Sequence, residues 1–447
     1  MARIRPFSAY RYDLGRVRAA DVLTQPYDKI TPAMRERYLA ASPYNLVRVI
    51  LGEKLENDSE RDNVYTRAAE HLQSWIEQGI LRADPEPGIY PYEQSFRRPG
   101  AEAGGRNDRS TRHGFIALGA LEEYSNRVVF RHEQTLSGPK LDRQALLRAT
   151  RTHFGQIFML YSDPSQKVEA ELLARATNPV LEADDEYDTR HRLFRETDAG
   201  VIERLQQQLA PLPLIIADGH HRYETALQWR NEQNGNAPHR AAEGRGHPWD
   251  WVMMTFINLD APGLVVLPTH RLVYGLDGWD AAQAWAKLRQ CFDVEDTGLR
   301  LDPSNAGPIV QKLARAERPP LFAAALQGSR SISLLRPKPD LDWAALLPEL
   351  LPEQRRLDVV LLHRLALDRS LGVTPEMVRG ERCLRYVKDA GEALQSVAAG
   401  AAQAAFLLNP IPAAQVRDVA LAGAVLPQKS TDFFPKLLTG LTLYRAV

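Results

Sequence analysis

The amino-acid sequence predicts a mixed α/β fold, and three observations lead to this prediction. Short apolar runs bounded by turn residues, typical of buried strands, occur together with longer segments whose apolar residues recur at helical spacing. The 447 residues suffice for two domains with sizeable cores, and 44% hydrophobic with 25% charged residues is an ordinary globular composition. The 30 prolines and 28 glycines indicate many turns rather than a bundle of long helices.

The expected elements follow from these patterns in chain order. Helices are expected at residues 32–41, 62–78, from 139, from 220, at 279–291 and at 357–368. Strands are expected at residues 45–51, 89–96, 114–121, 128–130, 156–161, 214–217, 252–259, 264–267, 320–326, 331–336 and 405–408. Residues 164–209 are expected to form a helical, charged connector with a solvated face.

The chain is expected to divide near residue 275. Residues 1–275 would form an N-terminal body that contains the functional site. Residues 276–447 would form a smaller C-terminal α+β part, because an Ala- and Leu-rich helical texture begins at Trp279. The C-terminal tail is bounded by prolines and contains aromatic residues, unlike a frayed polar terminus, so we expect it to fold back to the site cleft.

Charge and cysteine usage exclude several classes of protein. Lys+Arg and Asp+Glu both number 56, and a net charge of zero argues against a large nucleic-acid surface. Cys291 and Cys383 lie far apart, which excludes a disulfide scaffold and a zinc ribbon. No apolar stretch is long enough to span a bilayer, and the first residues contain no signal-like apolar run. We therefore expect a cytoplasmic protein without a membrane partner. The sequence does not determine its oligomeric state.

The chain is organised around a strand, a glycine turn and a helix at residues 214–230. Residues 214–217 are a buried apolar run, Asp218-Gly219 is a turn dipeptide, and an apolar helical stripe follows. The stripe consists of Tyr223, Ala226 and Leu227.

The first turn of this helix has the residues of an anion site. Free backbone N–H groups and the helix dipole favour an anion there, and two imidazoles and a guanidinium add donors. The expected phosphate-binding residues are Gly219, His220, His221 and Arg222. Asp218 is a carboxylate among donors, which could hold a metal ion, orient a histidine or cap the helix.

Two further expected strands, residues 128–130 and 264–267, are followed by acidic, basic or imidazole residues. Residues 128–130 lead into His132 and Glu133, and an adjacent imidazole and carboxylate suit acid–base chemistry because each tunes the pKa of the other. A surface ion pair of these residues with Arg131 or Arg143 is the alternative. Further cationic or imidazole groups that would complete an anion-handling cleft are Lys140, Arg143, His270, Arg271 and Lys429.

Seven short motifs occur in order along the chain and together resemble one known family. They are Ile4-Arg5-Pro6-Phe7, Pro26-Tyr27-Asp28, His132-Glu133-Gln134-Thr135, Lys140-Leu141-Asp142-Arg143, the segment from Ala217 to Ala226, Pro268-Thr269-His270-Arg271 and Pro427-Gln428-Lys429-Ser430-Thr431. The set resembles the bacterial family known as domain of unknown function 1015, over nearly the whole chain.

The Asp218–Arg222 segment alone also resembles a motif of the ParB/sulfiredoxin-like superfamily. That superfamily includes nucleotide-binding partition proteins and kinases that phosphorylate free serine. The resemblance implies a ParB/sulfiredoxin-like core in which this turn and helix start hold nucleotide phosphates. It covers under a tenth of the chain, and the sequence contains neither a P-loop nor a protein-kinase signature.

The leading hypothesis is a phosphotransferase that uses ATP or ADP with Mg²⁺ and acts on a small hydroxylated metabolite such as serine. Glu133, beside His132, is the expected base for the hydroxyl proton, and Asp218 has a metal-binding or orienting role. The cationic groups named above would neutralise developing charge. Glu133, His220, Arg222 and His270 are expected to converge on one cleft.

Three alternatives remain open at this point. A phosphohydrolase would use the same residues with water as the acceptor. A nucleotide-binding regulatory protein would bind without chemistry. A metalloenzyme with histidine ligands ranks last, because adjacent loop histidines rarely ligate one metal together.

Overall fold

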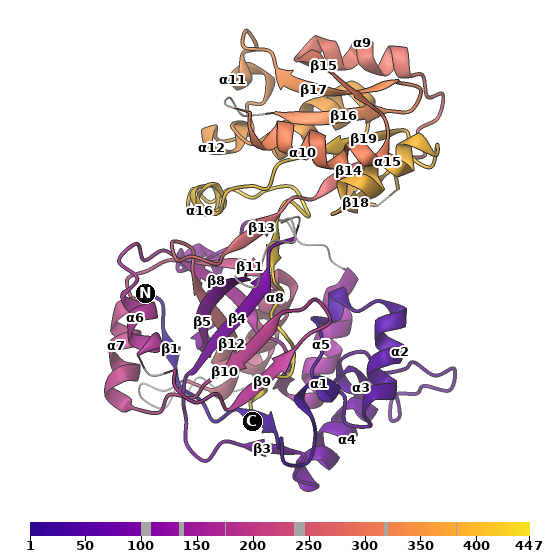
Figure 1. Cartoon of the computed structure of the whole chain (residues 1–447). Helices are drawn as coiled ribbons and strands as arrows, with labels where there is room; N and C mark the ends of the chain where they lie inside the picture. Colours follow the sequence, from indigo (N-terminus) through magenta and orange to yellow (C-terminus); the bar gives the residue numbers. More distant parts are fainter. Residues whose placement is uncertain (100–108, 134–137, 175, 237–245, 317–320, 381) are drawn as a thin grey trace. The chain divides into compact units, whose positions relative to one another are not determined.

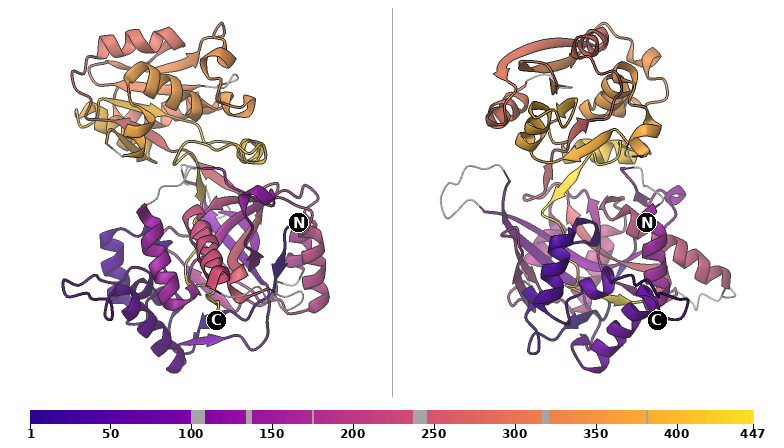
Figure 2. Two further views of the ribbon diagram at one scale, coloured as in Figure 1. Left: turned by 180° about the vertical axis from the view of Figure 1, so that it is seen from behind. Right: turned by 90° about the vertical axis from the view of Figure 1, so that its right-hand side faces the viewer.

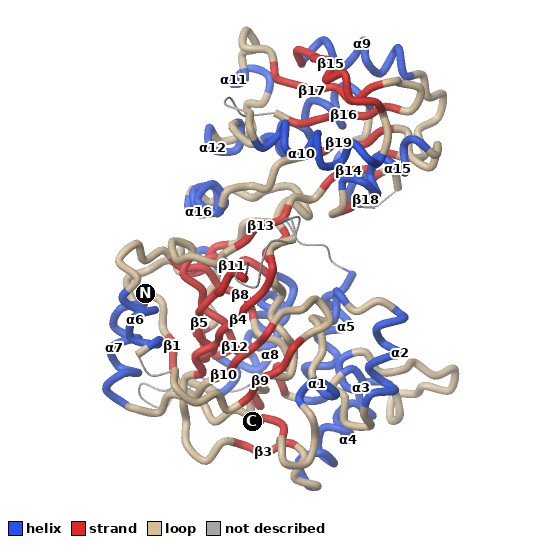
Figure 3. Tube along the Cα trace, in the orientation of Figure 1, coloured by secondary structure: helices blue, strands red, loops and turns tan. Residues whose placement is uncertain are grey.

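The computed structural model describes residues 1–447 except 100–108, 134–137, 175, 237–245, 317–320 and 381. The chain forms two compact units, each described here by itself (Figure 1). The first unit comprises Met1–Arg131, Thr135–Val265 and Pro435–Val447, and the second comprises His132–Gln134 and Val266–Phe434. Both units combine helices with a sheet, which confirms the mixed α/β class (Figure 3). The expected division at residue 275 into separate domains stays a prediction.

A mixed sheet forms the centre of the first unit. Its strand order is β6-β11-β8-β12-β5-β4-β10-β9, with β1 paired to β5. The strands are β1 Ile4–Arg5, β4 Tyr90–Arg97, β5 Arg109–Ala120, β6 Val129–Phe130, β8 Ile157–Tyr161, β9 Leu181–Asp184, β10 Arg190–Leu193, β11 Leu214–Asp218 and β12 Trp251–Asn258. β6 runs parallel to β11 and β8 parallel to β12. β8 and β12 are buried along their whole length. This explains why their sequences are near-continuous apolar runs, as is typical of strands covered on both faces of a sheet.

Short strands outside this sheet pair β2 with β3 and β7 with β21. They are β2 Tyr10–Tyr12, β3 Leu81–Ala83, β7 Thr152–His153 and β21 Tyr444–Arg445. The β7–β21 pair fixes the end of the chain inside the first unit, because Tyr444 lies opposite His153.

The first unit also contains helices beside its sheet (Figure 2). They are α1 Ala19–Val22, α2 Pro32–Ala41, α3 Val47–Ile50, α4 Val64–Glu77, α5 Gly138–Thr150, α6 Lys167–Leu173, α7 Ala199–Leu209 and α8 His220–Asn236. Apolar residues of α6, α7 and α8 form one core with the strands, for example Leu172, Leu205 and Tyr223. α5 packs against both α8 and α4.

The strand expected at residues 45–51 is wrong, because this stretch forms the helical turn α3. The Asn45 side chain accepts a hydrogen bond from the Val47 N–H at 2.9 Å, which starts the turn. Leu46, Val47 and Ile50 are all buried. A short run of buried β-branched and aliphatic residues does not distinguish a strand from a buried helical turn.

The expected helical connector at residues 164–209 is wrong in its middle part, where β9 and β10 form a hairpin between α6 and α7. Opposite charges alternate across the hairpin: Arg190 contacts Asp184 at 3.0 Å. His191 is fully buried and pairs with Asp185 at 3.1 Å, so it lies in the interior rather than on a solvated face. The opposite charges that pair across the two strands were the sequence feature that indicated a hairpin rather than a helix.

The second unit has an antiparallel sheet of strand order β15-β17-β16-β19-β14-β18. Its strands are β14 His270–Val273, β15 Phe292–Arg300, β16 Phe322–Leu326, β17 Ser331–Pro337, β18 Leu384–Val387 and β19 Ala404–Leu407, with β13 Val265–Leu267 and β20 Asp432–Phe434 outside this sheet. Its helices are α9 Ala281–Cys291, α10 Ala306–Ala314, α11 Trp343–Leu346, α12 Pro352–Arg355, α13 Asp358–Leu361, α14 Pro375–Arg379, α15 Ala390–Ala398 and α16 Ala413–Leu421. α13 continues into a π-helix at Leu362–Ser370.

Apolar residues of β16, β19, α10 and α15 form the core of this unit. Within the residue ranges that the structure describes, no helix combines the length and the apolar character needed to cross a membrane.

Candidate functional site

The predicted strand, turn and helix around Gly219 are confirmed. β11 buries its four apolar residues between β6 and β8, and α8 begins directly after Gly219. Tyr223, Ala226 and Leu227 are buried in the core of the first unit, which explains why this face of α8 is apolar.

Gly219 makes room for the guanidinium of Arg222. The glycine has φ +92°, and a Cβ atom at this position would lie 3.0–3.1 Å from guanidinium atoms of Arg222. Any other residue would therefore be strained and would displace the guanidinium. Arg222 Nη1 donates to the backbone carbonyl of Gln156, and this hydrogen bond fixes the side chain over the turn.

Asp218 lies among positive charges. Its Oδ2 accepts from Lys436 Nζ at 2.9 Å, and its Oδ1 is 3.8 Å from Arg222 Nη2. Burial alone would raise the pKa of Asp218, but Lys436, Arg222 and Lys29 outweigh it and hold this pKa well below its usual range. The carboxylate therefore orders a group of cations at neutral pH.

This environment does not fit a Mg²⁺ ligand. A divalent cation at Asp218 would meet Lys436 and Arg222 at close range and would be repelled. Among the residues described, no three His, Cys, Asp or Glu side chains gather as a metal site either.

The C-terminal segment supplies Lys436 and holds it in place. Arg112 Nη2 donates to the Pro435 carbonyl at 2.6 Å, and Gln94 Nε2 donates to the Lys436 carbonyl at 2.8 Å. Arg112 is fully buried, and burial lowers its pKa to about 9. The segment then continues across the first unit to Tyr444, whose ring stacks on His153.

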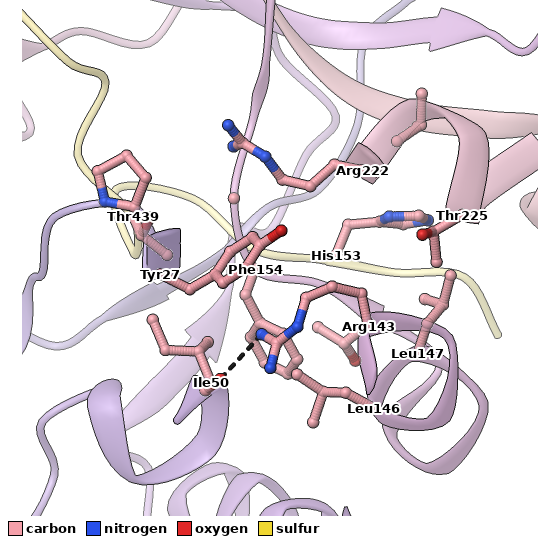
Figure 4. A pocket seen from close by; sticks show the side chains of 14 residues that line it. Tyr27, Ile50, Arg143, Leu146, Leu147, His153, Phe154, Arg222, Thr225 and Thr439 are labelled. Atoms are coloured by element: carbon pink, nitrogen blue, oxygen red, sulfur yellow. Dashed lines mark hydrogen bonds between the residues drawn. The ribbon is translucent and has the colours of Figure 1, made fainter. Parts of the chain in front are cut away.

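A pocket lies beside the first turns of α8, entirely within the first unit (Figure 4). It is lined by Pro26, Tyr27, Ile50, Arg143, Leu146, Leu147, Thr152, His153, Phe154, Gly155, Arg222, Thr225, Val252 and Thr439. The wall is mostly apolar and contains two guanidinium groups, the usual character of a site for a small molecule. Its volume of about 70 Å³ is several times what one water molecule needs, so it suits a small group such as a phosphate.

Two arginines from different helices meet this pocket. Arg143 Nη1 donates to the Ile50 carbonyl at 2.8 Å, and its guanidinium lies 4.4 Å from the centre of the Tyr27 ring. Arg222 and Arg143 both lower the pKa of Tyr27, although burial raises it more, so both guanidinium groups lie near the phenol. The largely apolar pocket therefore presents two guanidinium groups, of which Arg143 also donates from Nε to Asp142 Oδ2 at 2.9 Å and Arg222 lies near Asp218.

Buried polar atoms without partners accompany these arginines. In the described part of the chain, His153 Nε2 and Thr225 Oγ1 have no hydrogen-bond partner, and both residues are more than nine-tenths buried. The neighbouring Gln156 amide also lacks a partner among described residues. A buried polar group without a hydrogen bond costs about 1–3 kcal/mol, so such groups on a pocket wall indicate a polar ligand.

Replacing Thr225 by valine should test this interpretation. Valine has nearly the same shape, and removal of an unpartnered hydroxyl should leave the free energy of unfolding unchanged within about 0.5 kcal/mol. Binding of a phosphate ligand should weaken by about 1 kcal/mol, roughly fivefold, because the hydroxyl can then no longer bond it. Parallel denaturant and calorimetric titrations measure both values. An unchanged affinity in the folded variant would show that Thr225 does not contact the ligand.

The other expected phosphate-binding residues of the first unit lie on α5 and at the start of α8. His220 is buried, with 8% of its surface exposed. Lys140 belongs to α5, but its side chain lies outside the described residues. The expected role of these residues and of His221 stays a prediction.

His132 and Glu133 belong to the second unit and form a cluster with the loop at Ser430 and Thr431. Glu133 Oε1 accepts from the Ser430 N–H at 2.9 Å, the Thr431 N–H at 3.0 Å and Thr431 Oγ1 at 3.1 Å. His132 Nε2 lies 2.8 Å from the same Thr431 hydroxyl and 3.7 Å from Glu133 Oε1. This geometry holds a loop, and the expected role of Glu133 as a general base stays a prediction.

His270, Arg271 and Lys429 also belong to the second unit. Arg271 is fully buried and donates to the carbonyls of Gln428 at 3.3 Å and Lys429 at 3.2 Å. His270 Nδ1 accepts from the Leu408 N–H at 3.2 Å, and burial followed by the charge of Arg271 lowers the pKa of His270 to about 4. The imidazole is therefore neutral at pH 7. The convergence expected of Glu133, His220, Arg222 and His270 stays a prediction.

Glu133→Ala should destabilise the second unit by about 2 kcal/mol, because two backbone N–H groups lose a charged acceptor. Glu133→Gln keeps an oxygen for these donors and should destabilise it by less than half as much. Urea unfolding followed by tryptophan fluorescence measures both effects. Equal stabilities of the two variants would show that the hydrogen bonds to Ser430 and Thr431 contribute little.

Three residues of the first-unit site were not expected from the sequence: Lys29, Lys436 and His153. The Pro26-Tyr27-Asp28 motif directly precedes Lys29 and was the available signal for it. The aromatic, Pro-bounded tail predicted a C-terminal segment that folds back to the site. Lys429 was the lysine expected there, whereas Lys436 contacts Asp218. The place of His153 in the pocket depends on the pairing of β7 with β21, which joins segments far apart in the chain.

Comparisons with known proteins place the chain in a family. Residues 4–360 match the family described as "Protein of unknown function (DUF1015)". Among solved structures, a free serine kinase in complex with AMP is similar with a TM-score of 0.35 and 12% identity, over 73% of this chain and 92% of that chain. A conserved hypothetical protein from Pyrococcus furiosus is similar with a TM-score of 0.34 and 11% identity, over 71% and 90% of the two chains. SbnI from Staphylococcus aureus, truncated at its C-terminus, has a TM-score of 0.33 and 10% identity, over 74% and 88%.

Likenesses this low carry no argument about what the chain binds or does. No curated protein matches the sequence. The family match, in contrast, spans well over half of the chain and includes the whole strand, turn and helix around Gly219. The chain belongs to the DUF1015 family.

Proposed function

We propose that the first unit binds the phosphates of a nucleotide, ATP or ADP, in the pocket beside α8 and transfers a phosphoryl group to a small hydroxylated metabolite. The observation that carries the proposal is the convergence of Arg143 and Arg222 on a mostly apolar pocket. Buried polar atoms of His153 and Thr225 that lack partners among the described residues lie on its wall. Guanidinium groups bind phosphate oxygens bidentately, and an apolar wall suits a ligand with a larger organic part.

The residues of the site supply what phosphoryl transfer needs. Charge spreads over the phosphoryl oxygens in the transition state, so fixed cations stabilise it more than the ground state. Arg222 is fixed by a backbone carbonyl, Arg143 by a backbone carbonyl and the Asp142 carboxylate, and Lys436 by Asp218. These cations need little reorganisation when the ligand binds.

Asp218 suits a positioning role in this reaction. A general base works best when its pKa lies near the working pH, and the pKa of Asp218 lies far below it. Its negative charge instead keeps Lys436 and Arg222 in place. Resemblance of Asp218–Arg222 to the ParB/sulfiredoxin-like superfamily, which includes kinases of free serine, makes serine the first acceptor to test.

The experiment combines binding with product analysis on the full chain. Calorimetric titration with AMP, ADP and ATP measures binding, and ³¹P NMR follows phosphoryl transfer to serine and other small hydroxy compounds. Arg143→Gln is the test variant, and Arg148→Gln is the matched control. Arg148 lies on the same helix, is half exposed and pairs with Glu232 at 2.7 Å away from the pocket wall.

Nucleotide binding should weaken by about 2 kcal/mol in Arg143→Gln and stay unchanged in Arg148→Gln. A phosphorylated acceptor would support the kinase, whereas release of inorganic phosphate without an acceptor would favour the phosphohydrolase. Tight binding without turnover would favour the regulatory protein. No nucleotide binding by the folded wild-type chain would refute the proposal.

A further inference from the structure

A second pocket of the first unit lies among the helices α2, α3 and α4. It has a volume of about 220 Å³ and is lined by Arg35, Leu39, Arg48, Gly52, Glu53, Leu55, Val64, Arg67 and His71. None of these residues lines the pocket beside α8. Three arginines and a histidine around one small cavity are unusual for a merely structural gap, because like charges repel each other.

Two of the arginines form no ion pair among the described residues. Arg67 pairs with Asp58 and Asp62, each at 2.7 Å. Arg35 and Arg48, both half-buried, have no carboxylate within 4.0 Å in the described ranges of the chain. The pocket therefore offers two guanidinium groups that form no ion pair among the described residues, although the acidic residue Glu53 also lines it.

Backbone hydrogen bonds hold these two guanidinium groups in place. Arg35 Nε donates to the Leu51 carbonyl at 2.9 Å, and Arg48 Nη2 donates to the Leu39 carbonyl at 2.8 Å. Arg48 Nε is buried and has no partner among the described residues. Each guanidinium thus keeps further N–H groups for a ligand, and its fixed position lowers the entropy that binding costs.

The electrostatics of His71 agree with a positive pocket. Burial lowers the pKa of His71, Arg48 and Arg67 lower it further, and Glu70 opposes them. Its ring lies against Trp75, with 6.1 Å between centroids and 29° between planes. A neutral imidazole in this position can donate one hydrogen bond to an anion.

Gly52 closes the pocket by letting the chain after α3 approach α4. A Cβ atom at Gly52 would lie 2.9 Å from Val64 Cγ2 and 3.0 Å from the Arg48 carbonyl oxygen. The glycine is therefore needed for this close approach, and Arg48 and Arg67 both line the pocket beside it.

We propose that this pocket is a second anion site, which binds the phosphate group of a small ligand independently of the pocket beside α8. Arg35 and Arg48 provide the charge and the donors, and His71 provides a further N–H. Leu39, Leu55 and Val64 supply an apolar wall for the short carbon chain of a phosphate monoester. Inorganic phosphate would make the same contacts with the arginines, but it has no carbon chain to pack against the apolar wall.

The test uses the ring signals of His71 in ¹H–¹³C NMR spectra of the full chain, identified by their loss in His71→Gln. Inorganic phosphate and glycerol 3-phosphate are titrated separately into wild type, Arg35→Gln and Arg48→Gln. Arg37→Gln is the matched control, because Arg37 lies on α2, is 60% exposed and is not on the wall of this pocket. Arg222→Gln controls for the first pocket.

Both ligands should shift the His71 signals in wild type, Arg37→Gln and Arg222→Gln with similar dissociation constants. Arg35→Gln and Arg48→Gln should each weaken the binding by about tenfold, since each removes a charged hydrogen bond. Two variants on different helices guard against a folding defect in either, and thermal unfolding checks both. Unshifted His71 signals at tens of millimolar of both ligands, or equal affinities in wild type and both folded variants, would overturn the proposal.

Discussion

Arg222→Gln should weaken nucleotide binding by about 2 kcal/mol, roughly 30-fold, as much as Arg143→Gln. Arg222 lines the pocket beside α8, and a guanidinium fixed by the Gln156 carbonyl can bind phosphate bidentately. Glutamine retains a polar side chain but removes the charge and the fork of donors. Isothermal titration with ADP measures the effect.

The stability of this variant needs its own control. The Arg222 side chain is only 17% exposed, so its removal should lower the free energy of unfolding by about 1 kcal/mol. Arg230→Gln is the matched control on the same helix, because Arg230 donates to the Leu121 carbonyl at 2.6 Å outside the pocket. It should lose stability but keep the affinity for ADP. If both variants lost affinity equally, the loss would come from stability rather than from a phosphate contact.

Asp218→Asn should have the largest effect on stability. The substitution leaves Lys436, Arg222 and Lys29 without the carboxylate that stabilises them, and breaking a largely buried ion pair costs about 3 kcal/mol. A bound anion can replace the lost charge. Phosphate should therefore raise the midpoint of thermal unfolding more in Asp218→Asn than in wild type, while phosphoryl transfer falls by about a hundredfold. An equal thermal shift in both proteins would show that Asp218 does not compensate the cations of the pocket.

The pH dependence of this difference follows from the depressed pKa of Asp218. A group whose folded-state pKa lies below its unfolded value of about 3.9 stabilises the protein above that value. Its contribution decreases as the pH falls below about 4 and is lost once the folded-state pKa is passed. Wild type and Asp218→Asn should therefore differ fully at pH 7 and progressively less below pH 4. Urea unfolding at several pH values measures the difference, and a constant gap would contradict the assignment.

Patterns within ten or twenty residues were sufficient to predict much of the fold and the first part of the site. The apolar run at 214–217, the Asp218-Gly219 turn and the helical stripe of α8 were confirmed because each depends on local backbone preferences and on the period of apolar residues. Short segments were less predictable. Residues 45–51 and the hairpin β9–β10 were assigned wrongly, since burial and cross-strand charge pairs decided their structure.

The amino-acid sequence by itself determined the mixed α/β class, the glycine turn before α8 and the cationic first turn of that helix, because these depend on neighbouring residues. Only the tertiary structure decided that Lys436 and not Lys429 contacts Asp218, and that Arg143 and His153 line the pocket with Arg222. It also placed Glu133 against Ser430 and Thr431. These contacts join residues that are far apart in the chain, and long-range packing and buried charge, rather than local propensity, select them.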